Sequence, residues 1–364
     1  MYITPIMKIE LERVKRLKSV LERFYESGRQ DTESFLIDPA DNYLYFKTTR
    51  ISGRIVLPME MDDGEEIPSF FVDAMKFLHL TKNYTELNVH DDLVFYHGKD
   101  TFKIPTFHDD SLAEDVRTNP AFDENCRDNE IIYDEELLTL LQKANLFVDG
   151  AHSQVRLRGA FIQNGKLVSV NKALVFEAGV NHISADHSLT KKMISIILGL
   201  GEKTTVQRCN KPYRIVNPEY EIEIIMPHDN SLEMPDTDSD KFVENYHHDT
   251  KMVLGRKDLS DAITFVNGYT KLASHDGVRL TVDDDVLAIE SIEDGLFHKV
   301  VPLNTVDDGL DGLSFQVSAK KLDLVLKAIR SDHIQIRADA IHPLIEFTGI
   351  EDDSFHVILA KIKE

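Results

Sequence analysis

The strongest constraint on the fold is a pattern of amphipathic segments that occurs three times along the 364 residues. Each copy has an apolar stripe at helical spacing and then segments in which apolar and polar residues alternate. A second helical stripe and further alternating segments follow. The copies share this order and length without sharing sequence identity. Such a repeat predicts an α+β protein with three copies of one architecture, each with two helices packed on antiparallel sheets.

The six expected helices each have apolar residues spaced three and four positions apart, which places these residues on one face. We expect these helices at residues 11–24, 72–82, 134–148, 188–199, 258–273 and 318–330. The segments between them have the alternation and turn residues of strands, and residues 155–158 in the second copy are among the expected strands.

Two acidic stretches with weak periodicity, residues 108–130 and 227–250, separate the copies and are expected to be interdomain linkers. They divide the chain into predicted domains at residues 1–115, 131–240 and 251–364.

Composition restricts the class of protein. The net charge of −22 argues against a basic surface all round, but permits a protein that is acidic outside and locally basic where it meets phosphate. No stretch approaches the length of a membrane helix, and the N-terminus lacks the pattern of a secretion signal, so we expect a cytoplasmic protein. Cys126 and Cys209 lack metal-ligand spacing and are expected to be unpaired thiols.

Positive charge gathers on the polar faces of the expected helices, although the chain as a whole is acidic. Lysine and arginine side chains that meet only phosphate bind nucleic acid without reading its sequence. The alternative is that these are ordinary solvated helix faces. The candidate DNA-binding residues from this pattern are Lys15, Arg16, Arg23, Lys76, Lys191, Lys192, Lys320 and Lys327.

Motifs of catalysis are absent from the sequence: it has no phosphate-binding loop, dinucleotide fingerprint, nucleophile elbow or zinc-protease helix. The pair His247 and His248 lies in a predicted linker and is expected to be a solvated loop. The acidic runs at 283–285, 307–308 and 352–353 lie between strands, where aspartate is a common turn residue. We therefore predict a protein that is not an enzyme, with no cofactor and no bound metal.

Four segments resemble the bacterial β sliding clamp, the beta subunit family of DNA polymerase III. Three lie in the last copy: residues 274–282 (SHDGVRLTV), 315–329 (FQVSAKKLDLVLKAI) and 355–362 (FHVILAKI). The fourth, residues 7–13 (MKIELER), resembles the opening strand of the family. Each motif is weak by itself, but their order covers the whole chain.

The resemblance implies three clamp (processivity-fold) domains per subunit and a ring made by a head-to-tail homodimer. Such a ring encircles double-stranded DNA, is opened by a clamp loader and tethers a DNA polymerase. Phe107 and Leu112 in the first domain and Leu272 in the third are the interface candidates, with ordinary core residues as the alternative. Arg29 lies close to where the family places a DNA-contacting arginine after its first helix.

The resemblance also implies a groove between the second and third domains that accepts apolar peptides from partner proteins. The positions that match its walls are Leu157, Leu174, Pro235, Val357 and Leu359. The family has a Gly-His-Arg turn where this chain has residues 170–176 (VNKALVF), so we expect a different groove and a different set of partners. A clamp encoded by a bacteriophage, acting in the host cytoplasm, is expected to differ in this way.

Two other classes of function remain open. One is a clamp-fold interaction protein, such as a transcription co-activator or a decoy, that does not encircle DNA. The other is a metal-dependent hydrolase built from the acidic turns.

Overall fold

The fold is taken from a computed structural model of the chain. It describes residues 7–9, 11–25, 34–48, 50–61, 67–81, 86–89, 92–97, 100–118, 122, 129–209, 212–270, 276–292 and 297–362. The chain forms two compact units, one of residues 1–138 with 195–229 and one of residues 139–194 with 230–364. The boundary between these units crosses the second predicted domain, so the division into three domains stays a prediction.

The first unit is built on an antiparallel sheet of eleven strands in the order β10-β15-β16-β17-β4-β3-β2-β6-β9-β8-β7. These strands are β2 (Ser34–Asp38), β3 (Tyr43–Lys47), β4 (Ser52–Val56), β6 (Phe70–Asp73), β7 (Glu86–Val89), β8 (Asp92–His97), β9 (Asp100–Phe107), β10 (Glu130–Tyr133), β15 (Thr204–Arg208), β16 (Pro212–Asn217) and β17 (Ile222–Pro227). A separate pair joins β1 (Met7–Ile9) to β5 (Met59–Met61). Strands of the first and second predicted domains thus share one sheet.

The second unit has an antiparallel sheet of twelve strands in the order β14-β11-β12-β13-β25-β24-β23-β18-β21-β20-β19-β22. These are β11 (Gly159–Gln163), β12 (Lys166–Asn171), β13 (Leu174–Gly179), β14 (His187–Thr190), β18 (Lys251–Gly255), β19 (Gly277–Asp283), β20 (Val286–Ser291), β21 (His298–Val306), β22 (Ser314–Ser318), β23 (His333–Arg337), β24 (Leu344–Gly349) and β25 (Phe355–Ala360). Here β13 of the second predicted domain pairs with β25 of the third.

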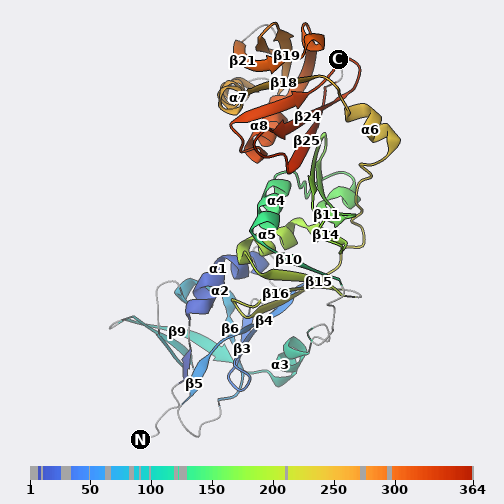
Figure 1. Cartoon of the computed structure of the whole chain (residues 1–364). Coiled ribbons are helices and arrows are strands. Elements are labelled where there is room, and N and C mark those ends of the chain that lie inside the picture. Colours follow the sequence, from blue (N-terminus) through green and yellow to red (C-terminus); the bar gives the residue numbers. More distant parts are fainter. Residues whose placement is uncertain are drawn as a thin grey trace, which may run out of the picture. The chain divides into compact units, whose positions relative to one another are not determined.

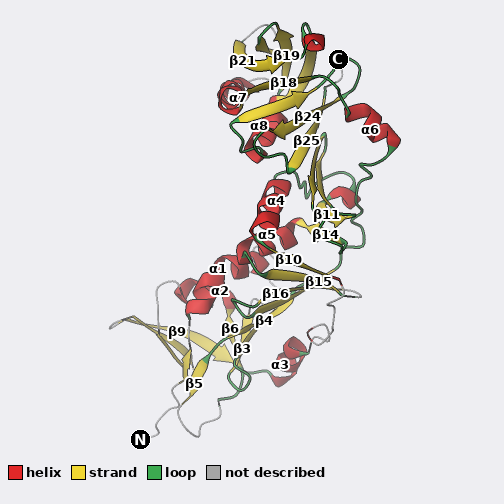
Figure 2. Ribbon diagram, viewed as in Figure 1, coloured by secondary structure: helices red, strands yellow, loops and turns green. Residues whose placement is uncertain are grey.

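All six predicted helices are confirmed, with ends shifted by a few residues. They are α1 (Glu12–Tyr25), α2 (Ala74–Thr81), α4 (Glu135–Asn145), α5 (Lys191–Leu200), α7 (Arg256–Thr270) and α8 (Ala319–Ala328). Within the first unit α1 packs against α2, and within the second unit α7 packs against α8 (Figure 2). None of the described helices is long and apolar enough to cross a membrane.

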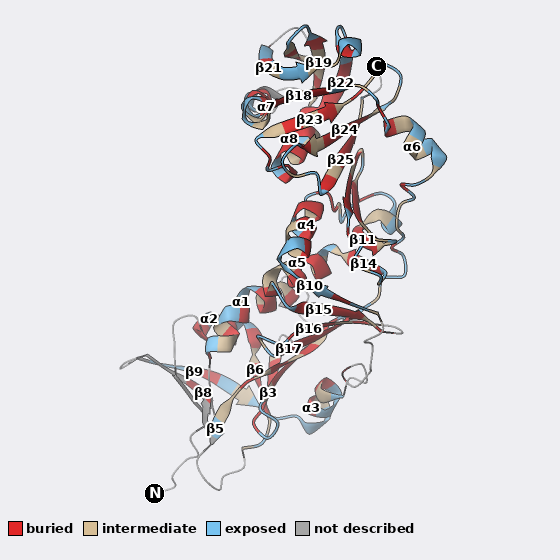
Figure 3. Ribbon diagram, in the orientation of Figure 1, coloured by how far each residue is buried: buried red, intermediate tan, exposed pale blue. Residues whose placement is uncertain are grey.

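Strands β2 and β3 of the first unit are buried on both faces, because helices cover both faces of the sheet there. Phe35 and Phe46 face α1 and α2, where Phe46 stacks on Phe24 of α1. The neighbouring residues Leu36 and Tyr45 point the other way, toward the short helix α3 (Asp110–Arg117). Figure 1 shows α3 on the face of the sheet opposite α1 and α2, and the buried residues follow the strands between them (Figure 3).

The two stretches predicted to be linkers each contain a short helix, and their role as linkers stays a prediction. The acidic stretch 108–130 contains α3, whose first turn is capped by the Asp109 carboxylate accepting from the Leu112 backbone N–H. The stretch 227–250 contains α6 (Asp240–Tyr246), which is capped by Ser239 in the same way. Both helices are short, so capping and a few apolar contacts hold them without a long periodic stripe.

Two local expectations are wrong. The segment 155–158 is not a strand, because Val155–Leu157 forms a 3-10 helix. Cys209 is disulfide-bonded, so the expectation of an unpaired thiol fails for this residue, and Cys126 lies outside the described residues.

Candidate functional site

The first and second predicted domains are joined by the strand pair of β4 with β17. The carboxylate of Glu223 lies at this junction. Glu223 on β17 lies opposite Arg54 on β4, and the Arg54 guanidinium contacts Glu223 Oε2 at 2.8 Å. Arg214 on β16 contacts the other oxygen, Glu223 Oε1, at 2.5 Å. The Glu223 side chain is 10% exposed, so both cations compensate a largely buried charge.

The junction between the second and third predicted domains is the pair of β13 with β25. Phe176 on β13 stacks on Phe147 and Phe355, with ring centroids 5.7 and 5.2 Å away. Lys143 on α4 contacts Asp352 at 2.6 Å and lies over the ring of Phe355. Burial would raise the pKa of the Asp352 carboxyl, but hydrogen bonds from Lys143 and Ser354 outweigh it and lower that pKa.

The predicted DNA-binding cations do not all remain available for phosphate. Arg16 is exposed and pairs with Glu12 one helical turn away at 3.6 Å. Arg23 donates to the backbone oxygen of Ser195 on α5 and, at 2.7 Å, to its hydroxyl. Arg23 therefore ties α1 to α5 within the first unit.

Other cations of the predicted set are engaged to different degrees. Lys76 contacts Asp73 at 3.3 Å and Lys327 contacts Asp323 at 2.7 Å. Lys191 donates to the Val148 carbonyl at 3.3 Å, and Lys192 also has an interaction partner. Arg29 lies outside the described residues.

Lys15 and Lys320 are different, because neither has an ion pair within the described part of the chain. Lys15 is half-buried on α1, and Lys320 is exposed at the first turn of α8. Lys321, next to Lys320 on α8, has a lowered pKa, because it is partly buried. These two are the predicted cations whose ammonium groups are left for a ligand.

The predicted groove residues divide into two groups. Leu174, Val357 and Leu359 are fully buried, and Leu174 lies directly opposite Leu359 in the strand pair. They lie in the core and present no surface to a ligand in this conformation. Leu157 and Pro235 are half-buried and remain accessible.

The segment that departs from the family pattern forms a tight turn between β12 and β13. Asn171 pairs with Leu174, so Lys172 and Ala173 alone make the turn, with Lys172 at φ 50°. The Ala173 carbonyl accepts from Ala360 N–H at the end of β25. The turn thus borders the same strand as the predicted groove residues.

The interface candidates of the first unit are partly exposed. Phe107 ends β9, is 45% exposed and stacks on Phe71 at 5.0 Å. Leu112 packs against the core cluster beneath α3. Leu272 lies outside the described residues. Phe265 on α7, which the sequence analysis did not single out, is 40% exposed.

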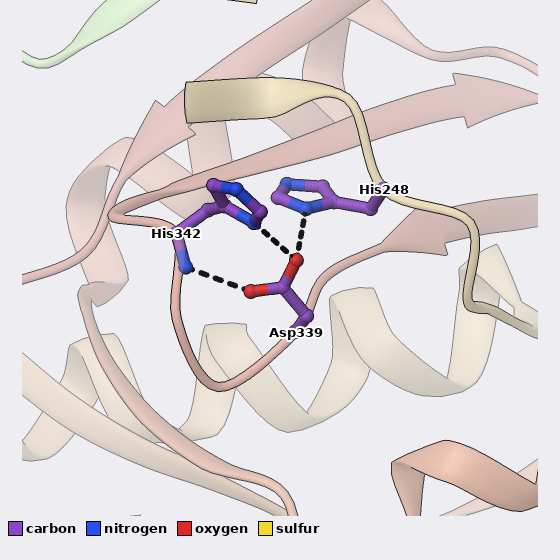
Figure 4. Close-up of side chains that lie close together, drawn as sticks. All are labelled: His248, Asp339 and His342. Atoms are coloured by element: carbon purple, nitrogen blue, oxygen red, sulfur yellow. Dashed lines mark hydrogen bonds and ion pairs between the residues drawn. The ribbon is translucent and has the colours of Figure 1, made fainter. Parts of the chain in front are cut away.

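A cluster of two histidines and one aspartate was also missed. Figure 4 shows His248 and His342 pointing at the same carboxylate of Asp339. The His248 side chain has no exposed surface, so the expectation that His247 and His248 form a solvated loop is wrong for His248, although His247 is exposed. The three-residue spacing of Asp339 and His342 could have indicated that they act together. His248 is remote in sequence and lies next to them only in the folded chain.

The Asp339 carboxylate is fixed by several hydrogen bonds. Burial alone would raise the pKa of Asp339, but donors from the His342 backbone and the imidazoles of His342 and His248 hold it well below its usual range. Asp339 Oδ1 accepts from the backbone N–H groups of Ile341 at 2.8 Å and His342 at 2.7 Å. Asp339 Oδ2 is left to the two imidazoles.

Comparison with known proteins identifies the class of fold. No family model matches the sequence, and no curated protein matches it. Solved structures match over nearly the whole chain, and they are clamps: the chain has the fold of bacterial beta sliding clamps.

Three of these structures illustrate the likeness. The DNA polymerase III beta subunit of Thermotoga maritima has a TM-score of 0.80 at 18% identity. The beta clamp of Helicobacter pylori, in complex with 3,4-difluorobenzamide, has a TM-score of 0.80 at 14% identity. The DnaN sliding clamp of Pseudomonas aeruginosa, bound to griselimycin, has a TM-score of 0.77 at 14% identity. In each case 99% of this chain and 100% of the other chain are covered.

Proposed function

We propose that this protein is a DNA sliding clamp, a non-catalytic processivity factor that encircles duplex DNA and tethers a DNA polymerase. The observation that carries the proposal is the likeness to clamps over 99% of this chain and 100% of theirs. A match over part of the chain would indicate only one domain in common with clamps. A match from end to end covers all the strands that a ring-forming subunit needs.

The ring is a head-to-tail homodimer in which the first domain of one subunit meets the third domain of the other. Exposed apolar side chains on both domains support this arrangement. Phe107 and Phe102 on β9 are 45% and 53% exposed in the first domain. Phe265 on α7 and Val300 on β21 are 40% and 49% exposed in the third domain. Large apolar side chains that are exposed in the isolated subunit are candidates for a protein interface.

Duplex DNA passes through the ring and is held by weak contacts to phosphate. Lys15 and Lys320 supply ammonium groups without acidic partners in the described chain, and Arg16 is exposed on the same helix as Lys15. A closed ring cannot leave DNA sideways, so a few such contacts suffice. A clamp loader opens the ring.

Partner proteins dock through short apolar peptides near Leu157 and Pro235. The two-residue turn at Lys172 and Ala173 supports a groove that differs from the family's. We propose on this basis that the protein is encoded by a bacteriophage, acts in the host cytoplasm and uses its own set of partners.

Solution mass separates this proposal from an interaction protein of the same fold that does not form a ring. Light scattering is expected to give twice the 41.5 kDa mass of the chain. Phe107→Glu, which places a charge at the proposed interface, is expected to yield monomers.

The matched control is Ile132→Glu, since Ile132 is 61% exposed on β10 and lies outside the proposed interface. A monomeric wild-type protein, or a dimer unaffected by Phe107→Glu, would count against the ring.

A further inference from the structure

The cluster of His248, Asp339 and His342 has the composition and convergence of a metal site. Each residue directs one ligand atom to a common point, and these atoms all lie within 4.8 Å of one another. Imidazole nitrogen and carboxylate oxygen are ligands of Zn²⁺, at about 2.0–2.2 Å from the ion. Nothing in the proposed clamp function uses this cluster.

The hydrogen bonds of His248 fix which of its nitrogens is a ligand. Its Nε2 lies 2.9 Å from the backbone oxygen of Leu344, which can only accept, so Nε2 carries a proton. Its Nδ1 faces Asp339 Oδ2, 2.8 Å away. The position between these two atoms takes either a proton on Nδ1, as in a hydrogen bond, or a metal ion that replaces this proton.

His342 adds a second nitrogen at the same oxygen. Its Nδ1 contacts Asp339 Oδ2 directly, as Figure 4 shows, while its backbone N–H holds Oδ1. One carboxylate oxygen therefore faces two imidazole nitrogens. A single divalent ion at this point would bind all three groups.

The surroundings orient these ligands as outer-shell groups do in metal sites. A ligating histidine usually donates its other ring N–H to a carbonyl or carboxylate, and the bond from His248 to Leu344 is of this kind. Lys361 donates to the backbone oxygen of Asp339 and not to its carboxylate, so Oδ2 remains for the ion.

Two of the three side chains in the cluster are in contact with solvent. The His248 side chain has no exposed surface, whereas those of Asp339 and His342 are 26% and 32% exposed. An ion can enter past His342 and keep a water molecule as its remaining ligand. Three protein ligands and one open position are typical of zinc sites that bind a further group.

We propose that His248 Nδ1, His342 Nδ1 and Asp339 Oδ2 bind a divalent transition-metal ion of the zinc type. The site adjoins the end of β25, because Leu344 pairs with Ala360 and the Pro343 carbonyl accepts from Lys361 N–H. It is independent of the clamp proposal, since it depends only on contacts among residues 248–361, which lie within the second unit.

Isothermal titration of the full-length, chelator-treated protein with ZnCl₂ tests the site. One Zn²⁺ per chain is expected. His342→Ala and Asp339→Asn are each expected to weaken binding by more than about 10-fold, because even the loss of an outer-shell partner costs that much. Co²⁺ in place of Zn²⁺ is expected to show the visible absorption of a four-coordinate ion.

His247→Ala is the matched control, because it removes an exposed imidazole next to His248 without touching the cluster. It is expected to bind Zn²⁺ as the wild type does. Circular dichroism of His342→Ala, whose side chain is partly exposed, shows whether the variant remains folded. No stoichiometric Zn²⁺ in the wild type, or equal binding by folded His342→Ala, would overturn the proposal and leave a hydrogen-bonded imidazolium in its place.

Discussion

Individual buried side chains at the strand pair of β13 with β25 carry charges that depend on pH. His356 on β25 lies opposite Glu177 on β13. Burial lowers the pKa of the His356 imidazole below its ordinary value of 6.5, and the carboxylates of Glu346 and Glu177 offset this only in part. Its buried Nε2 has no hydrogen-bond partner among the described residues. The folded protein therefore favours the neutral ring.

Acid is expected to weaken the protein through His356. Because the folded pKa lies below the unfolded value, the unfolded chain binds the proton first as pH falls through about 6.5, and the free energy of unfolding decreases. Denaturant unfolding at pH 8 and pH 5.5 measures the difference, which His356→Leu is expected to reduce. His298→Leu, at an exposed histidine paired with Glu290, is the control. An unchanged pH dependence in His356→Leu would contradict the assignment.

Removal of the Lys143 ammonium is expected to destabilise the second unit by about 2 kcal/mol, the range for a hydrogen bond to a charged group. Lys143→Met keeps the bulk of the side chain but leaves the Asp352 carboxylate without its 2.6 Å partner. Urea unfolding measures the loss. The double variant Lys143→Met/Asp352→Asn is expected to recover part of it, and no recovery would mean that the packing over Phe355 matters more than the charge.

At the scale of elements, much of the secondary structure follows from local pattern. The six long helices were predicted from apolar stripes, and the Asn164–Gly165 turn between β11 and β12 has the positive φ angles that such a turn requires. The short helices α3 and α6 were missed, because contacts with residues remote in sequence stabilise them. Arg23 was predicted to face DNA, yet it bonds Ser195, which no local pattern shows.

The cluster of His248, Asp339 and His342 could not be predicted from local sequence pattern either. Asp339 and His342 are close in sequence, but His248 comes from the segment before β18 and meets them only when β18, β23 and β24 form one sheet. Three of the five predicted groove residues are fully buried. Matching by sequence position does not show whether a residue is exposed at a surface or buried in the core beneath it.

The lack of a side chain at Gly53 leaves room for the Phe46 ring, against which α1 packs. Gly53 on β4 lies opposite Phe46 on β3, and a Cβ at Gly53 would lie 2.1 Å from the Phe46 ring. That ring stacks on Phe24 of α1 at 4.9 Å. Gly53→Val is expected to displace the ring and lower the free energy of unfolding by about 1–3 kcal/mol, as overpacking does. Thermal unfolding measures this, with Ser52→Val on the same strand as the control. A stable Gly53→Val protein with α1 in place would contradict this role.

At the scale of the whole molecule, strand pairs at both junctions make each sheet continuous between predicted domains. Sheets continued in this way suit a subunit that closes a ring, where every free edge is covered by a neighbour. In the proposed ring the acidic composition would repel nucleic acid from the outside, while Lys15 and Lys320 would favour contact with phosphate.

The contacts with DNA are expected to be electrostatic and independent of base sequence. Lys15→Gln and Lys320→Gln are each expected to reduce the slope of log affinity against log salt by about 0.9 for each phosphate that the variant no longer neutralises. Fluorescence anisotropy with duplex DNA at several salt concentrations measures this. Lys251→Gln, at an exposed lysine on β18, is the control and is expected to leave the slope unchanged. Equal slopes for all variants would place the DNA elsewhere.

Retention on circular DNA tests the central claim most directly. The dimer is incubated with linear duplex DNA, onto which a ring can thread from an end, and the DNA is then ligated into a circle. The circle is separated from free protein at high salt and is then cut once. We predict that the protein stays on the circle and is lost from the linear product, because a ring slides off a free end. Equal retention on circular and linear DNA would contradict a sliding ring.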